Sequence, residues 1–189
     1  MAEHDADRWD AKYEGRPMPT AGPTSALARL EAWLPVDGRA LDVAGGDGAQ
    51  AVWLAQRGLH VTLCDVSAVA LDRARTLAAR SGVALDTVRT DLETDPLPRG
   101  PWDVVVCTNY LQVSLWGAVA RALAVGGVAL WAHPTVANLE RHAKPSARFL
   151  LEPGRGRATF EEAGLTILHA EETWIGDRHL SCVVGRRDA

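Results

Sequence analysis

The residues best suited to chemistry lie in a glycine-rich segment between an apolar run at 39–43 and a helical pattern at 49–57. The segment consists of Ala44-Gly45-Gly46-Asp47-Gly48. Glycine lets the backbone bend sharply and come close to a ligand, and a helix N-terminus offers unpaired N–H groups. The segment therefore predicts a binding site for a nucleotide-like ligand.

Three acidic residues stand at or near the ends of the first three predicted strands. Asp42 lies inside the first strand, just before the glycines, where its carboxylate could order the loop. Asp65 ends the second strand, 17 residues after Gly48, where a carboxylate can accept both hydroxyls of a ribose. Asp91 closes the third strand and suits the amino group of an adenine, with Leu92 beside it. The acids favour a ligand that contains adenosine.

The glycine-rich segment by itself leaves three interpretations open. A purely structural turn between strand and helix also uses glycine, and 46–51 satisfies the G-x-G-x-x-G/A fingerprint of nicotinamide dinucleotide sites. S-adenosylmethionine is favoured because Asp42 suits a positively charged methionine moiety but would be poorly placed beside a pyrophosphate. Asp91 supports the same choice. A dehydrogenase normally needs a further substrate domain, for which 189 residues leave little room.

The hydrophobic pattern alternates between short apolar runs and longer amphipathic ones. The short runs predict strands at 39–43, 59–64, 84–90, 102–108 and 127–133. The amphipathic patterns predict helices at 24–34, 49–57, 67–80, 112–124 and about 157–163. Strands that alternate with helices need crossover connections, so we expect a mostly parallel sheet covered on both faces.

The C-terminal part departs from this alternation. Two strand-like runs, 165–174 and 179–186, are joined by only four residues. A connection that short makes an antiparallel pair. Together the patterns predict an α/β fold, a Rossmann-like doubly wound sheet that is mostly parallel and ends in an antiparallel C-terminal hairpin.

Length and composition fit one compact domain. The chain has 189 residues, of which 47% are apolar and 23% charged, as in ordinary globular proteins. We expect a single domain over 24–189. The net charge of −4 gives no basic field for a phosphate backbone, so we expect a small-molecule partner and no nucleic acid.

The cysteines and the N-terminus bear on the cellular location. Cys64, Cys107 and Cys182 are odd in number and embedded in apolar runs, which predicts buried free thiols in a reducing compartment rather than disulfides or metal ligands. The start of the chain lacks the pattern of a signal peptide, and no stretch approaches 18 continuous apolar residues. We therefore expect a cytoplasmic protein without a membrane span or bound metal, present as a monomer or weak homo-oligomer.

Five successive segments are similar to the motifs of class I S-adenosylmethionine-dependent methyltransferases, namely 41–48, 63–67, 89–92, 102–109 and 123–130. The segments 7–13 and 148–154 more narrowly resemble small bacterial enzymes of the tellurite-resistance and thiopurine methyltransferase type. The resemblance implies that an N-terminal segment, 1–23, folds over the cofactor as a lid. Arg8, Trp9 and Tyr13 would then contact it.

The resemblance also implies a place for each part of S-adenosylmethionine. The methionine end would lie at the first strand and its loop, the ribose at the end of the second strand, the adenine at the end of the third and the sulfonium at the loop after the fourth. In that order the implied residues are Asp42, Ala44, Gly45, Gly46 and Gly48; Asp65 and Val66; Asp91 and Leu92; and Asn109.

Ala44 departs from the commoner family pattern, which has the first glycine of the loop at this position. Alanine fits there if its backbone φ is negative. A positive φ would cost on the order of 1 kcal/mol or more, because the left-handed region is unfavourable for residues with a Cβ.

Methyl transfer from a sulfonium is an in-line displacement with an already activated donor, so a catalytic base is optional. His133, at the carboxyl end of the fifth strand, is the candidate if the acceptor must lose a proton, although it could equally be a hydrogen-bonded residue that shapes the edge. Tyr110, Arg148 and Arg155 are candidates for lining the acceptor pocket. Two other functions stay open: a methyltransferase-like fold that binds a ligand or partner without catalysis, and an NAD(P)-dependent reductase.

Overall fold

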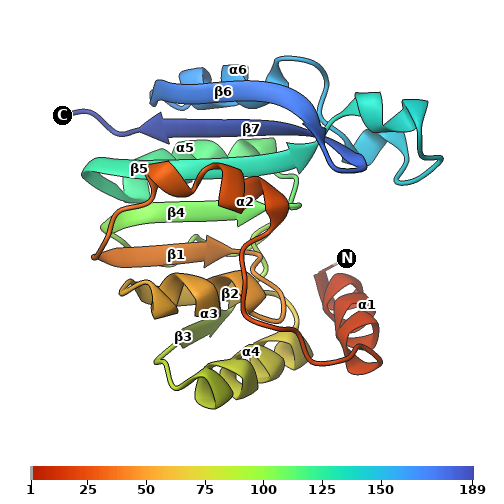
Figure 1. Cartoon of the computed structure of the whole chain (residues 1–189), viewed down its shortest axis with the longest axis vertical. Helices are drawn as coiled ribbons and strands as arrows, with labels where there is room; N and C mark the ends of the chain where they lie inside the picture. Colours follow the sequence, from red (N-terminus) through yellow and green to blue (C-terminus); the bar gives the residue numbers. More distant parts are fainter. Residues whose placement is uncertain (1) are drawn as a thin grey trace.

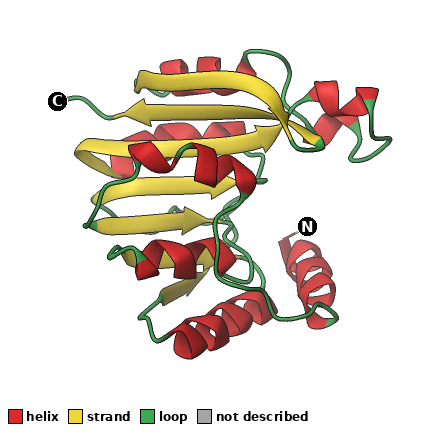
Figure 2. Ribbon diagram, viewed as in Figure 1, coloured by secondary structure: helices red, strands yellow, loops and turns green. Residues whose placement is uncertain are grey.

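The computed structural model describes residues 2–189, with side chains from residue 5 onward, and its centre is a seven-stranded sheet (Figures 1 and 2). The order across the sheet is β3-β2-β1-β4-β5-β7-β6. The strands are β1 Arg39–Val43, β2 His60–Asp65, β3 Asp86–Arg89, β4 Trp102–Thr108, β5 Leu123–Pro134, β6 Thr166–Ile175 and β7 Arg178–Arg186. This is the predicted α/β class.

The first five strands are parallel, and the hairpin of β6 and β7 is antiparallel to them. The chain builds the sheet outward from β1 toward β3 and then returns to add β4 on the other side of β1. The carboxyl ends of β1 and β4 therefore form a topological switch point, where ligands bind in open α/β sheets. The doubly wound topology and the closing hairpin are both confirmed.

Helices cover both faces of the sheet, as Figure 2 shows. Residues of α2, α3 and α4 share one buried cluster with the sheet, and residues of α5 and α6 share another. The helices are α1 Ala2–Glu14, α2 Ser25–Arg29, α3 Ala49–Gln56, α4 Ala68–Ser81, α5 Trp116–Ala122 and α6 Arg155–Glu162. Short 3-10 turns are η1 Glu31–Trp33, η2 Val113–Leu115, η3 Val136–Glu140 and η4 Ala147–Phe149.

Two predicted helices are shorter than their patterns indicated. The pattern at 24–34 divides into α2 and η1, and the one at 112–124 divides into η2 and α5. At the second helix the prediction of 123–124 was wrong, because Leu123 is fully buried as the first residue of β5 and pairs with Trp102. A single apolar residue at the boundary can be buried equally well in a helix or in a strand, so the hydrophobic period does not show which element it belongs to.

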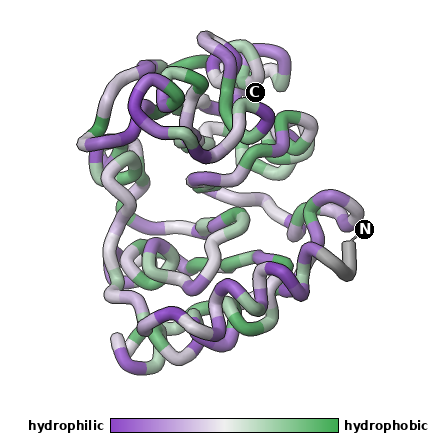
Figure 3. Tube along the Cα trace, turned by 90° about the vertical axis from the view of Figure 1, so that its right-hand side faces the viewer, coloured by the Kyte–Doolittle hydropathy of each residue, from purple (hydrophilic) through white to green (hydrophobic). Residues whose placement is uncertain are grey.

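Two segments stand at the carboxyl ends of the parallel strands. Helix α1 lies beside the ends of β1 and β2 and contacts α4 (Figure 1). Residues 135–151, which include η3 and η4, leave the sheet after β5 at the same edge, and Thr135 pairs with Leu151 where the loop returns. Figure 3 looks onto this edge, with α1 beside the label N. The switch point thus lies between two elements that are not part of the sheet.

Within residues 2–189, no helix is both long enough and apolar enough to cross a bilayer. The same residues contain no cluster of three or more side chains arranged to hold a metal ion. The three cysteines are free and buried.

Candidate active site

The glycine-rich loop between β1 and α3 turns through three residues with positive φ: Ala44 at 51°, Gly46 at 59° and Gly48 at 83°. The N–H of Gly45 donates to the carbonyl of Cys64 at 3.2 Å, which ties the loop to the end of β2. Ala44 therefore occupies the left-handed region in which a Cβ is unfavourable, so the condition of a negative φ does not hold.

The loop is packed so closely that side chains would not fit at its glycines. A Cβ on Gly45 would lie 2.6 Å from Oδ2 of Asp42, and one on Gly48 would lie 2.5 Å from the Cβ of Ala74. A Cβ on Gly46 would collide with the hydroxyl of Tyr13. Only glycine fits at these positions, because the loop backbone packs closely against β1, α4 and α1.

Asp42 is the most deeply buried acid at the switch point, with no exposed surface. Its Oδ1 accepts a hydrogen bond from Nε2 of Gln50 at 3.1 Å, whereas Oδ2 has no partner within the described part of the chain. Burial raises the pKa of this carboxyl to about 7. A buried carboxylate oxygen without a partner is costly unless a cation or a hydrogen-bond donor lies near it.

Asp65, at the end of β2, joins the glycine loop to α4. Its Oδ2 accepts from the N–H of Gly46 and its Oδ1 from the N–H of Ser67, both at 2.9 Å. Burial raises the pKa of Asp65, and these hydrogen bonds act in the opposite direction. Each carboxylate oxygen can accept more than one hydrogen bond, so the group retains capacity for ribose hydroxyls. Val66 follows it and its carbonyl accepts from Nε of Arg89.

Asp91 and Leu92 lie just beyond β3. The N–H of Thr90 donates to the carbonyl of Asp65 at 3.0 Å, so the ends of β2 and β3 stay together. Oδ1 of Asp91 accepts from the N–H of Glu93, and Leu92 is buried. The predicted ribose and adenine residues are therefore brought to the same edge.

Helix α1 packs against the loop through residues that the sequence only partly indicated. Tyr13 is buried and stacks on Trp9 with ring centroids 6.1 Å apart. Burial, with Asp65 and Asp47 as lesser causes, raises the pKa of Tyr13 to about 12. Arg8 is exposed and pairs with Asp5, so it is not brought to the loop.

Asp10 is the contact residue of α1 that sequence reasoning missed. Its Oδ1 accepts from Oγ of Ser67 at 2.5 Å and from the N–H of Val69 at 3.1 Å. These groups lie at the N-terminus of α4. A carboxylate there accepts from free N–H groups and is stabilised by the positive end of the helix dipole. Asp10 is one of several acids near the start of the chain. Nothing in the sequence indicates that it caps a distant helix.

The ends of β4 and β5 carry the residues predicted for the sulfonium and the acceptor. Asn109, directly after β4, has a φ of 60°. Its N–H donates to the carbonyl of Ala132 and its Oδ1 accepts from Nη1 of Arg178 at 3.0 Å. Tyr110 is half-buried, and its hydroxyl donates to Oε1 of Gln112 at 2.6 Å. Sequence reasoning missed Arg178, which lies 69 residues from Asn109.

His133 is 5% exposed and its Nε2 lies 2.9 Å from the carbonyl oxygen of Phe149. A carbonyl only accepts, so Nε2 carries the proton and Nδ1 has the lone pair. Nδ1 has no partner in the described chain. Burial is the largest cause that lowers the pKa of His133 to about 4, so the ring is neutral at neutral pH.

The two arginines predicted for the acceptor pocket have other contacts. Arg148 is exposed and lies over the ring of Phe149 at 4.6 Å. Arg155 is paired with Glu162 of the same helix through two hydrogen bonds of 2.6 and 3.0 Å. Their role toward an acceptor stays a prediction.

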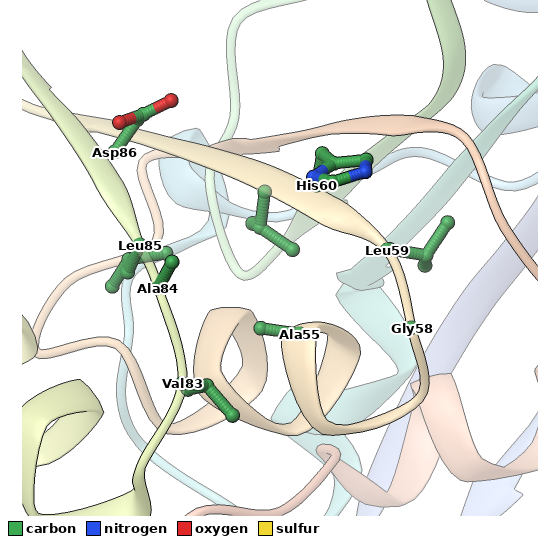
Figure 4. Close-up of a pocket in the computed structure, with 9 residues that line it drawn as sticks. Ala55, Gly58, Leu59, His60, Val83, Ala84, Leu85 and Asp86 are labelled. Atoms are coloured by element: carbon green, nitrogen blue, oxygen red, sulfur yellow. The ribbon is translucent and has the colours of Figure 1, made fainter.

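A cavity of about 320 Å³ lies at the opposite edge of the sheet (Figure 4). It is formed where β2 and β3 begin, with apolar residues from α3 and the segment before β3. Its ionisable side chains are His60 and Asp86. Because all the acids and glycines above lie at the carboxyl ends of the strands, this cavity is separate from the candidate active site.

A doubly wound sheet of this order, with a glycine turn after β1 and acids after β1, β2 and β3, has the architecture of class I methyltransferases. Residues 40–127 match the family model described as a methyltransferase domain. The predicted resemblance to methyltransferases is confirmed over these residues.

A ubiquinone biosynthesis O-methyltransferase of Marinobacter nauticus is 32% identical over 145 residues, which are 72% of this chain and 58% of that protein. The chain thus spans under two thirds of this relative. Two solved structures share the fold. An S-adenosylmethionine-dependent methyltransferase from Mesorhizobium loti has a TM-score of 0.71 at 21% identity and covers 87% of this chain and 98% of its own. A TehB-like S-adenosylmethionine-dependent methyltransferase from Corynebacterium glutamicum has a TM-score of 0.67 at 18% sequence identity. The match covers 99% of this chain and 98% of that one.

Replacing Ala44 with glycine removes the unfavourable left-handed Cβ. We expect Ala44→Gly to raise the free energy of unfolding by about 0.5–1 kcal/mol, after the entropy that glycine adds to the unfolded chain. Urea denaturation measures the change. As control, Ala79→Gly on the exposed side of α4 should lower the free energy by about 1 kcal/mol. A loss of stability in Ala44→Gly would contradict the positive φ.

Removing the Asp10 carboxylate should loosen α1. We expect Asp10→Ala to speed amide hydrogen exchange in α1 about tenfold, since the contact to the α4 N-terminus contributes about 1–2 kcal/mol. Asp7→Ala is the matched control, because Asp7 is exposed on the same helix. Equal exchange in the two variants would show that Asp10 does not hold α1 in place.

Proposed function

We propose that this protein transfers the methyl group of S-adenosylmethionine to a small-molecule acceptor by in-line displacement. The observation that carries the proposal is the fully buried Asp42 carboxylate, whose Oδ2 has no partner in the described chain and faces the glycine loop. A cationic group held at the glycine loop would lower the cost of this buried charge, whereas a pyrophosphate there would raise it. The relative named as a ubiquinone biosynthesis O-methyltransferase supports a small acceptor.

The cofactor supplies a methyl group bound to a sulfonium, which needs no further activation. The chain's residues then have to bind, orient and exclude water. Asp42 with the glycine loop would hold the methionine end, Asp65 with Val66 the ribose, and Asp91 with Leu92 the adenine. Helix α1, fixed by Asp10 and Tyr13, would cover the site as a lid.

The acceptor would approach from the ends of β4 and β5, where Asn109, Tyr110 and His133 lie. Holding a nucleophile in line with the methyl group replaces a bimolecular encounter, which is a large part of the catalytic effect. His133 would accept the acceptor's proton at Nδ1 where a proton must be removed.

Binding of S-adenosylhomocysteine tests the cofactor assignment. Isothermal titration should show heat with this compound and none with NADH. Asp65→Ala should weaken the affinity by about 1–3 kcal/mol, because charge-assisted hydrogen bonds to the ribose are lost.

Heat with NADH alone would contradict the proposal and favour a reductase. Unchanged binding in Asp65→Ala would show that the ribose assignment is wrong. Tight binding without methyl transfer to any small acceptor would favour a ligand-binding protein without catalysis.

The proposed role of His133 requires a neutral ring with its proton on Nε2. We expect nitrogen NMR to show this tautomer from about pH 5 to 8, whereas an ordinary histidine becomes protonated near pH 6.5. The proton is gained only as the pH falls through about 4, because burial disfavours the charged ring. A proton on Nδ1 would exclude His133 as the base, and protonation near 6.5 would contradict the effect of burial on its pKa.

A further inference from the structure

Arg178 extends across the carboxyl edge of the sheet. It is the first residue of β7, which pairs with β5, and Pro134 at the end of β5 stands opposite Leu180. Its Nη1 nevertheless reaches Oδ1 of Asn109, at the end of β4 on the far side of β5. Neighbouring strands lie about 4.8 Å apart, so the side chain spans the end of a whole strand. Its guanidinium lies over the ends of β4 and β5.

This guanidinium has no acidic counter-ion within residues 5–189, although the chain carries 24 acids against 20 bases. Other arginines with side-chain partners pair with carboxylates, as Arg29 does with Glu171 and Arg155 with Glu162. The partner of Arg178 is a neutral amide. The bond fixes the direction of the guanidinium without neutralising its charge.

Two features of the residues near Arg178 suit a ligand site. Asn109 has a φ of 60°, and such backbone strain persists where surrounding contacts hold it and is frequent at functional sites. Nδ1 of His133 is a buried polar atom without a partner in the described chain, in a side chain that is 5% exposed. The charge of Arg178 contributes to the low pKa of His133, as expected for neighbours.

Charge divides the edge into two halves. The half at β1, β2 and β3 carries the acids that suit a cationic methyl donor, namely Asp42, Asp65 and Asp91. The half at β4, β5 and β7 carries Arg178, which Asp177 precedes in the chain. The segment 135–151 beside it has three bases, Arg141, Lys144 and Arg148, against one acid, Glu140. If the methyl donor occupies the ends of β1, β2 and β3, the methyl acceptor has to bind at the ends of β4, β5 and β7.

We propose that Arg178 binds an anionic oxygen of the methyl acceptor, a carboxylate or a phenolate, and so selects anionic acceptors. The inference rests on the proposed function and deepens it. A guanidinium has five N–H donors in a planar fork, so the bond to Asn109 leaves others for the acceptor. Hydrogen bonds between a guanidinium and an oxygen anion are among the strong ones.

Matched probes that differ only in charge test this. Protein saturated with S-adenosylhomocysteine is titrated with benzoate and benzamide, and with 4-nitrophenolate and nitrobenzene, with binding followed by NMR. We expect at least one anion to bind about tenfold or more tightly than its neutral counterpart. The pair that shows the preference identifies the carboxylate or the phenolate.

Arg178→Gln should abolish this preference. Arg80→Gln is the control for net charge, because Arg80 is exposed near the end of α4. It should keep the preference.

Equal binding of both anions and their neutral counterparts overturns the proposal, and so does failure of both anions to bind. The proposal is also overturned if Arg178→Gln still binds the anion more tightly than its neutral counterpart. A failure of S-adenosylhomocysteine to bind contradicts the proposed function instead, and the same titrations on the protein without it still report on Arg178.

Discussion

The carboxylate of Asp65 is the interaction on which the rest of the site depends. Its two oxygens accept from the N–H groups of Gly46 and Ser67, so one buried charge joins the loop after β1 to the start of α4. Ser67 in turn donates its hydroxyl to Asp10 of α1. Burying a charge is costly unless it is hydrogen-bonded, and here the bonds that offset the cost also hold three segments in register. The glycine turn, Asp65 and helix α1 are therefore one connected unit.

The sequence predicted those parts of the molecule that depend on local pattern. Alternating apolar runs indicated the parallel sheet, and the short connection before Arg178 indicated the hairpin. The glycine loop and Asp65 follow from the same strand-to-helix spacing. The boundary at Leu123 was missed because burial in β5, rather than periodicity, decides it. The positive φ of Ala44 was left open because residue type favoured the other conformation.

The missed residues share a different property: each acts through a contact between distant segments. Asp10 and Ser67 are 57 residues apart, and Asn109 and Arg178 are 69 apart. Acids and arginines near loops are common, so their types alone do not identify them. Only the folded arrangement shows that one caps a helix and the other crosses the end of a strand. The resulting edge has acids at the ends of β1, β2 and β3 and a guanidinium without an acidic partner among the described residues at the ends of β4 and β5.

We propose that the glycine loop and Asp65 form the cofactor site at the carboxyl edge of β1 and β2. A crystal structure of the protein with S-adenosylhomocysteine would test this proposal. We expect the ligand between the loop and α1, with its amino group on the side of Asp42 and its ribose on Asp65. Density for the ligand at the opposite edge, in the cavity beside Leu59 and Leu85, would contradict it.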